Sequence, residues 1–153
     1  MAALTSARNT PEMADGGRVA VYPVEADTKI YLGSMVALNA AGNAAPATTA
    51  TGLKVIGRAD ARHGGAAGEN ADNTDGTAGA ISVVVKRGVF LLTNHATDAV
   101  TQAEVGKVCF ATDDHTVAKS NGTSTRSAAG RVVAIDPSGG VWVDLWHQSA
   151  AQS

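Results

Sequence analysis

The chain has 153 residues, of which 30 are alanine and 17 are glycine, and only 4% are aromatic. Lys and Arg number 12 and Asp and Glu number 14, so the formal net charge is −2. This balance excludes the basic footprint of a nucleic-acid-binding domain, and no apolar run approaches the ~18 residues that a membrane span needs. A chain of this length indicates one domain. Residues 1–17 contain no apolar stretch typical of a secretory signal, so we expect the cytoplasm or a particle assembled there.

The segment 1–18 is polar and has no hydrophobic period. Pro11 and the pair Gly16-Gly17 disfavour regular structure, although Thr10 as N-cap could begin one helical turn. We interpret the segment as an extended arm, with a disordered terminus as the alternative. The predicted organisation is an arm at 1–18, a single β domain at 19–147 and a flexible tail at 148–153.

From Val19 onward, short alternating runs of apolar residues predict strands. The expected strands are 19–22, two segments around Gly33 (30–32 and 36–38), 54–58, 81–93 with a bulge or bend at 86–88, 105–111, 116–119, 131–135 and 141–146. Thr101 and Glu104 match a capping box and predict one short helical turn. The segment 64–80 has almost no core-forming side chain and is expected to be a long loop, of the kind that is functional or mobile.

The sequence contains a weak internal repeat. When the sequence is aligned with itself at an offset of 73 residues, Gly57-Arg58 aligns with Gly130-Arg131 and Val36 aligns with Cys109. Identities are few, but both halves show the same order of glycines, short strands and turns. The predicted fold is all-β, a small β-barrel or β-sandwich built from two similar hairpin units. It has at most one short helical turn, near 101–105, and an extended N-terminal arm.

No catalytic or metal-binding pattern is visible in the sequence. The histidines have no metal-ligand spacing; they are His63, His95, His115 and His147. Asp113-Asp114 is expected to form a turn, and Cys109, the single cysteine, is expected to be a buried small hydrophobe. The segment 72–76 resembles half of a calcium loop, but it lacks the glycine and glutamate that complete one. We therefore expect no enzyme activity, no cofactor and no metal.

Several segments, taken in order, resemble the small capsid cement, or head decoration, proteins of tailed bacteriophages, a family formerly described only as a domain of unknown function. They span nearly the whole chain, except for the loop 64–80 and the residues after Trp146. The matching segments are 4–13 (LTSARNTPEM), 35–39 (MVALN), 52–59 (GLKVIGRA), 87–90 (RGVF), 106–109 (GKVC), 113–119 (DDHTVAK), 127–130 (SAAG) and 140–143 (GVWV).

The resemblance implies a structural protein on the exterior of the virion, assembled in the host cytoplasm, that binds the major capsid protein after the head expands. It also implies a homotrimer, with a dimer as the alternative, and no direct contact with nucleic acid or membrane. The arm could add a strand to an open edge of the capsid protein. Its candidate binding residues are Thr5, Ser6, Arg8, Asn9, Thr10, Pro11 and Glu12.

Trp142 and Trp146 have the even spacing of one strand face, which fits either a core or a subunit interface. Two other classes of protein are also consistent with the sequence. One is a free-standing β-sandwich module for carbohydrate or host-surface binding, which would use exposed aromatic side chains. The other is a small hydrolase that pairs Cys109 with a histidine.

Overall fold

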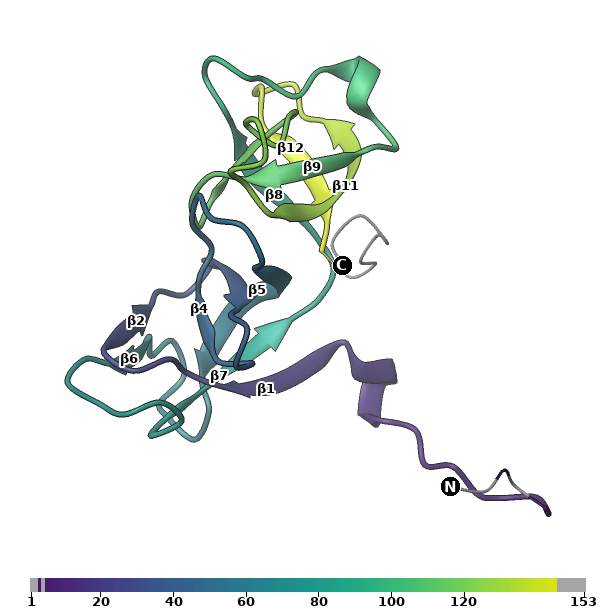
Figure 1. Cartoon of the computed structure of the whole chain (residues 1–153), viewed down its shortest axis with the longest axis vertical. Helices are drawn as coiled ribbons and strands as arrows, with labels where there is room; N and C mark the ends of the chain where they lie inside the picture. The colour runs from purple at the N-terminus through teal and green to yellow at the C-terminus, as the bar shows by residue number, and fades with distance from the viewer. Residues whose placement is uncertain (1–2, 4, 146–153) are drawn as a thin grey trace.

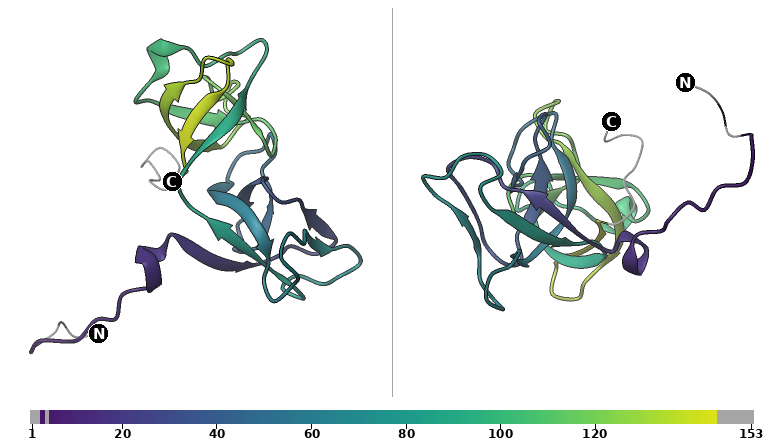
Figure 2. Two further views of the ribbon diagram at one scale, coloured as in Figure 1. Left: turned by 180° about the vertical axis from the view of Figure 1, so that it is seen from behind. Right: turned by 90° about the horizontal axis from the view of Figure 1, so that it is seen from below.

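A computed structural model describes residue 3 and residues 5–145, and nearly all of the regular structure in this part of the chain is β. Strands β1–β7 gather at one end of the body and β8–β12 at the other, while the arm projects away from the first group (Figures 1 and 2). The strands are β1 (Val19–Pro23), β2 (Thr28–Ile30), β3 (Met35–Leu38), β4 (Ala44–Pro46), β5 (Lys54–Arg62), β6 (Ala71–Asn73), β7 (Ser82–Lys86), β8 (Val89–Asn94), β9 (Val108–Ala111), β10 (Thr116–Ala118), β11 (Ala128–Ile135) and β12 (Val141–Asp144). The predicted all-β fold with an extended arm is confirmed.

The first sheet has the strand order β1-β7-β5-β3-β4, and all its pairs are antiparallel. Its two edges approach each other just beyond β1, where Val24 forms a parallel bridge with Ala44. The Glu25 N–H donates to the Ala44 carbonyl at 2.9 Å. The sheet is therefore almost closed on itself. We call these five strands, together with the two-stranded ribbon β2–β6, repeat 1.

The second sheet is a closed barrel in the order β10-β8-β12-β11-β9, with β9 paired to β10. Closure depends on a short parallel contact between β8 and β10, in which Thr93 lies opposite Thr116 and Asn94 opposite Val117. The His95 N–H extends this contact by donating to the Val117 carbonyl at 2.9 Å. We call these five strands repeat 2.

The two repeats have the same strand order when β1, β7, β5, β3 and β4 are matched with β8, β12, β11, β9 and β10. Val36 lies opposite Gly57 in repeat 1, and Cys109 lies opposite Gly130 in repeat 2. Both matched pairs differ by 73 positions (109 − 36 and 130 − 57), and the register shifts beside each of them. The two similar units predicted from the sequence are present. They are not two hairpins of one barrel or sandwich, however, because each forms a five-stranded sheet of its own and the second closes into a barrel.

The hydrophobic core has two parts. One lies within repeat 1 and contains Val24, Ile30, Val36, Ala44, Ile56, Ala59, Ala71, Val83 and Val85. The other fills the barrel but also takes in four side chains from the first half of the chain, Met35, Ala37, Ala47 and Val55. Hydrogen bonds cross the same boundary, since the Met35 N–H donates to the Asp114 carbonyl and the Ser127 hydroxyl to the Ala50 carbonyl. The repeats are therefore joined by shared packing.

The structure corrects several local expectations. The strand expected at 30–32 is β2 at Thr28–Ile30, the strand expected at 54–58 extends to Arg62, and β4 is not among the expected strands. The segment 64–80 is not entirely loop, because β6 forms within it and pairs with β2. The expected strand 81–93 is two strands that belong to different repeats, since the chain passes from β7 to β8 at 87–88. Strand β9 starts at Val108 instead of 105, and β11 starts at Ala128 instead of 131.

Two short helical turns are present where at most one was expected. The 3-10 turn η2 (Gln102–Glu104) has the predicted capping box, in which the Glu104 carboxylate accepts from the Thr101 N–H at 2.7 Å. A second 3-10 turn, η1 (Ala14–Gly17), follows Met13, so Thr10 is not its N-cap. None of the helical segments in the described part of the chain could span a lipid bilayer.

Candidate interaction surfaces

The N-terminal arm is the most exposed part of the described chain, because every side chain from Thr5 to Asp15 is exposed. All the arm residues identified from the sequence, Thr5, Ser6, Arg8, Asn9, Thr10, Pro11 and Glu12, lie in this stretch. None of them forms a hydrogen bond or ion pair with another described residue. The arm leaves the body beside β1 and runs outward (Figure 1).

The root of the arm is a tight turn that sets its direction. Asp15, Gly16 and Gly17 have φ values of 54°, 62° and 77°, which lie in the left-handed region that glycine adopts readily. Gly17 is buried, and a Cβ atom there would meet the Met13 sulfur at 3.4 Å. Because this turn leads directly into β1, the arm is anchored to an edge strand of repeat 1.

The second set of predicted contact residues is only partly described. Trp142 is half-buried on β12, and its indole N–H donates to the Asp136 carboxylate at 3.0 Å. The Ser138 hydroxyl, and to a smaller extent this indole, hold the pKa of Asp136 below its usual value. The indole is thus oriented along the outside of the barrel. Trp146, like the tail 148–153, lies outside the described residues.

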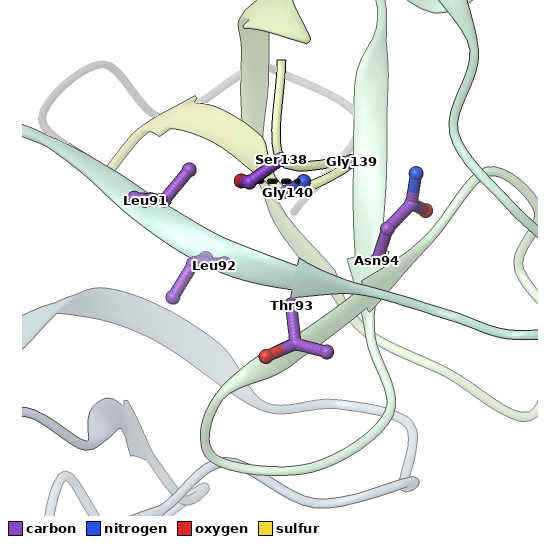
Figure 3. A pocket seen from close by; sticks show the side chains of 7 residues that line it. All are labelled: Leu91, Leu92, Thr93, Asn94, Ser138, Gly139 and Gly140. Carbon is purple, nitrogen blue, oxygen red and sulfur yellow. Dashed lines mark hydrogen bonds between the residues drawn. The ribbon is translucent and has the colours of Figure 1, made fainter. Parts of the chain in front are cut away.

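A shallow concavity of about 450 Å³ lies where β8 meets the 136–140 hairpin (Figure 3). Its lining residues are Leu91, Leu92, Thr93, Asn94, Ser138, Gly139 and Gly140. The Asn94 side chain is already engaged, because its amide donates to the Val100 carbonyl and accepts from the Val100 N–H, both at 2.8 Å. No aromatic side chain lines this concavity, so it lacks the stacking platform of a sugar site.

The turn Asp113-Asp114-His115 brings two carboxylates and an imidazole within 4.8 Å of one another. The carboxylates are occupied by bonds that shape the turn: Asp113 accepts from the His115 N–H at 2.8 Å, and Asp114 accepts from the Ser34 hydroxyl at 3.2 Å. The predicted turn is confirmed. It also docks repeat 2 onto repeat 1, because Ser34 immediately precedes β3.

The imidazole in this turn gives a testable pH dependence. The hydrogen bond to Asp114 raises the pKa of His115 above its ordinary value of 6.5. A raised folded-state pKa stabilises the fold below pH 6.5, and this contribution is lost as the pH rises through the folded-state pKa. We expect a small loss of stability over that interval, measured by urea unfolding. His115→Gln should remove the pH dependence, and an imidazole resonance that titrates below 6.5 would contradict it.

Cys109 is fully buried on β9, as predicted, and its environment suppresses reactivity. Desolvation raises the pKa of its thiol to about 12. Within the described chain, no histidine contacts it, and its sulfur points to the Gly130 carbonyl at 3.6 Å. We expect native protein to resist thiol reagents at pH 8 and urea-unfolded protein to react fully, as measured by mass spectrometry. Rapid labelling of the native state would reopen the hydrolase hypothesis.

The segment that resembles half of a calcium loop has a structural role. The buried Asn73 amide donates to the Glu25 and Thr77 carbonyls, at 2.8 and 2.9 Å. Asp72 accepts from the Thr74 N–H and hydroxyl, at 3.0 and 2.6 Å, and these bonds lower the pKa of its carboxyl. The polar side chains of this segment thus form hydrogen bonds within the loop and to the neighbouring backbone.

Sequence reasoning missed a set of exposed aliphatic side chains. Seven large hydrophobic residues are exposed in the described chain: Met13, Val19, Val21, Tyr31, Val89, Leu91 and Val133. Two pairs of them lie on the first strands of the two repeats, β1 and β8. The repeat seen in the sequence at an offset of 73 positions does not align these two strands, so no sequence signal identified the pairs.

These features define the molecule as a two-repeat, all-β protein with an exposed arm and apolar side chains on both first strands. No protein-family model matches the chain, and neither the curated proteins nor the solved structures include a significant match.

Proposed function

We propose that the protein is a structural component of a phage head, which binds the major capsid protein on the outside of the expanded shell and stabilises it. The observation that carries this proposal is the arm: residues 5–12 are exposed and make no hydrogen bond or ion pair with the other residues that the structure describes. Ordering such a segment costs conformational entropy, which a binding partner can repay. The sequence resemblance supplies the class of partner.

The chemistry of the described residues also favours a binding role over an enzymatic one. The described thiol is buried with a raised pKa. The described histidines that make side-chain contacts are engaged by backbone amides or by turn carboxylates, as at His95 and His115. The protein would act as an oligomer, a homotrimer or alternatively a dimer, located on the virion exterior, with no role for nucleic acid or a cofactor.

The arm would bind as an added strand, and Pro11 fixes which of its edges is used. N–H groups alternate in direction along a strand, and proline has none to offer. The edge that faces the capsid protein must therefore present the N–H groups of Ser6, Arg8 and Thr10. Eight residues of extended chain reach about 26 Å, enough for several ladder bonds.

Co-sedimentation with purified heads tests the proposal. The full chain should pellet with expanded heads and not with compact procapsids, and deletion of residues 2–15 should abolish binding. Ser6→Pro removes an N–H from the pairing edge and should weaken binding roughly tenfold. Ala7→Pro removes one from the opposite edge and is the matched control. Equal binding by the deletion variant and the full chain would refute the role of the arm, and failure of the full chain to pellet with expanded heads would refute the function.

A further inference from the structure

The two repeats expose the same pair of positions on their first strands. The Glu25 N–H donates to the Ala44 carbonyl in repeat 1, and the His95 N–H donates to the Val117 carbonyl in repeat 2. Because these two bonds are equivalent, Glu25 matches His95, and β1 aligns with β8 at an offset of 70 positions (95 − 25). Val19 then matches Val89, and Val21 matches Leu91. Their exposed fractions are 39% and 45% in repeat 1 and 45% and 47% in repeat 2. An aliphatic pair that is exposed at matching places in two diverged repeats indicates a shared use.

The backbone at both pairs is open as well. The Val24 N–H donates to the Ile81 carbonyl and Arg18 accepts from the Arg87 N–H, so even-numbered residues of β1 face β7. The groups of Val19 and Val21 therefore point to the free edge of the sheet. In repeat 2, β10 pairs with Thr93 and Asn94 of β8, and no described residue pairs with the same edge of β8 at 89–91. Unprotected apolar edges of this kind are sites of strand association.

The sheet faces that carry the two aliphatic pairs differ in charge at one matching position. Val19 lies opposite Lys86 on β7, whereas Val89 lies opposite Asp144 on β12. Directly opposite residues share a sheet face, so the lysine borders the first aliphatic pair and the aspartate borders the second. Arg131 lies opposite Asp144, but one strand farther from the open edge. The two faces are thus alike in apolar character and opposite in charge where they border the edge.

We propose that copies of the chain associate head to tail, with the repeat 1 face (Val19, Val21, Lys86) of one copy against the repeat 2 face (Val89, Leu91, Asp144) of the next. Charge complementarity between unlike faces of the same chain favours a second copy as the occupant. A head-to-tail contact closes into a ring when its rotation allows, which covers both faces in every copy. This inference rests on the self-association included in the proposed function, but not on binding to the capsid.

Charge reversal in the full chain tests the pairing, with the mass in solution measured by sedimentation velocity. The wild-type protein should be an oligomer. Lys86→Asp and Asp144→Lys should each raise the dissociation constant at least tenfold, and the double variant should return it to within about threefold of wild type. Lys54→Asp, at an exposed lysine at the start of β5, is the matched control and should leave the oligomer intact.

The aliphatic pairs provide a second, independent test. Val21→Lys and Leu91→Lys should each give folded monomers, because both side chains are exposed. Their unfolding midpoint should no longer depend on protein concentration, whereas that of the wild-type oligomer should. Tyr31→Lys, at a side chain 54% exposed outside both faces, should leave the mass unchanged. A monomeric wild-type chain, or lysine variants that keep the oligomer, would overturn the proposal. If the wild-type chain is monomeric and the lysine variants no longer bind heads, the two faces contact the capsid protein instead of a second copy. An intact oligomer that fails to bind heads would refute the capsid role alone.

Discussion

Replacement of Gly130 with alanine is expected to destabilise the protein by about 3 kcal/mol, because the backbone leaves no room for a Cβ atom. A Cβ at this position would overlap the Asp144 carbonyl oxygen and approach a Val143 methyl group at 3.0 Å. Both obstacles belong to β12, which is held by β8 on its other side. The barrel strand therefore cannot move away without breaking a ladder. Urea unfolding followed by circular dichroism measures the loss.

The matching position in repeat 1 allows an internal comparison. At Gly57 a Cβ would lie 2.6 Å from the Lys86 carbonyl oxygen, and φ is 151°. Gly57→Ala should therefore cost as much as Gly130→Ala or more. Gly42→Ala is the control for backbone strain alone, since φ is 86° and no atom lies within 4 Å of a Cβ there. A cost of about 1 kcal/mol is expected at Gly42. If all three variants lost equal stability, the steric explanation would be wrong.

This pair of glycines is an example of a structural feature that could be predicted from the sequence. Gly57-Arg58 and Gly130-Arg131 appear as a weak internal repeat in the sequence because both glycines meet the same requirement, a close approach of β5 to β7 and of β11 to β12. Local alternation of valines similarly marks β7, β11 and β12. Features set by backbone geometry or by a strand's own two faces were therefore predictable.

Features set by long-range pairing were not predictable. Strand β6 consists of Ala71, Asp72 and Asn73, which have no strand pattern of their own. It forms by pairing with β2, and the buried Asn73 amide adds a bond to the Glu25 carbonyl. The chain from Ile81 to Thr93 looks like one bent strand, since nothing local states that β7 and β8 join different sheets. Tertiary context assigns them.

The same limit applies to the candidate surfaces. The arm was predictable because it lacks core-forming residues and contains Pro11. The exposed pairs on β1 and β8 were not, because a strand such as Val89–Asn94 has apolar residues on both faces. Alternation separates the faces but does not say which one is covered. Only the barrel shows that Leu92 is buried and Leu91 is exposed.

Replacement of Met35 with alanine is the second change from which we expect a large effect, about 3 kcal/mol with both repeats unfolding together. Met35 belongs to repeat 1 and is fully buried, yet it packs into the barrel core with Leu145 and Val143. Its N–H also donates to the Asp114 carbonyl, so Met35 lies at the boundary where the repeats meet, and loss of its side chain weakens the packing there. Tryptophan fluorescence and far-ultraviolet circular dichroism should report one coincident urea transition in the wild type and in the variant.

Ile30→Ala tests whether this cooperativity extends across the whole body. Ile30 is also fully buried, but it lies in the core that repeat 1 does not share with the barrel. If the shared packing couples the repeats, Ile30→Ala should lower the urea midpoint measured by tryptophan fluorescence as much as the midpoint measured by circular dichroism. The comparison is informative because Trp142 lies in the other repeat. If the fluorescence transition stays at its wild-type position in Ile30→Ala, the repeats unfold independently. In that case Met35 would be a local packing residue of the barrel and not the coupling between the two units.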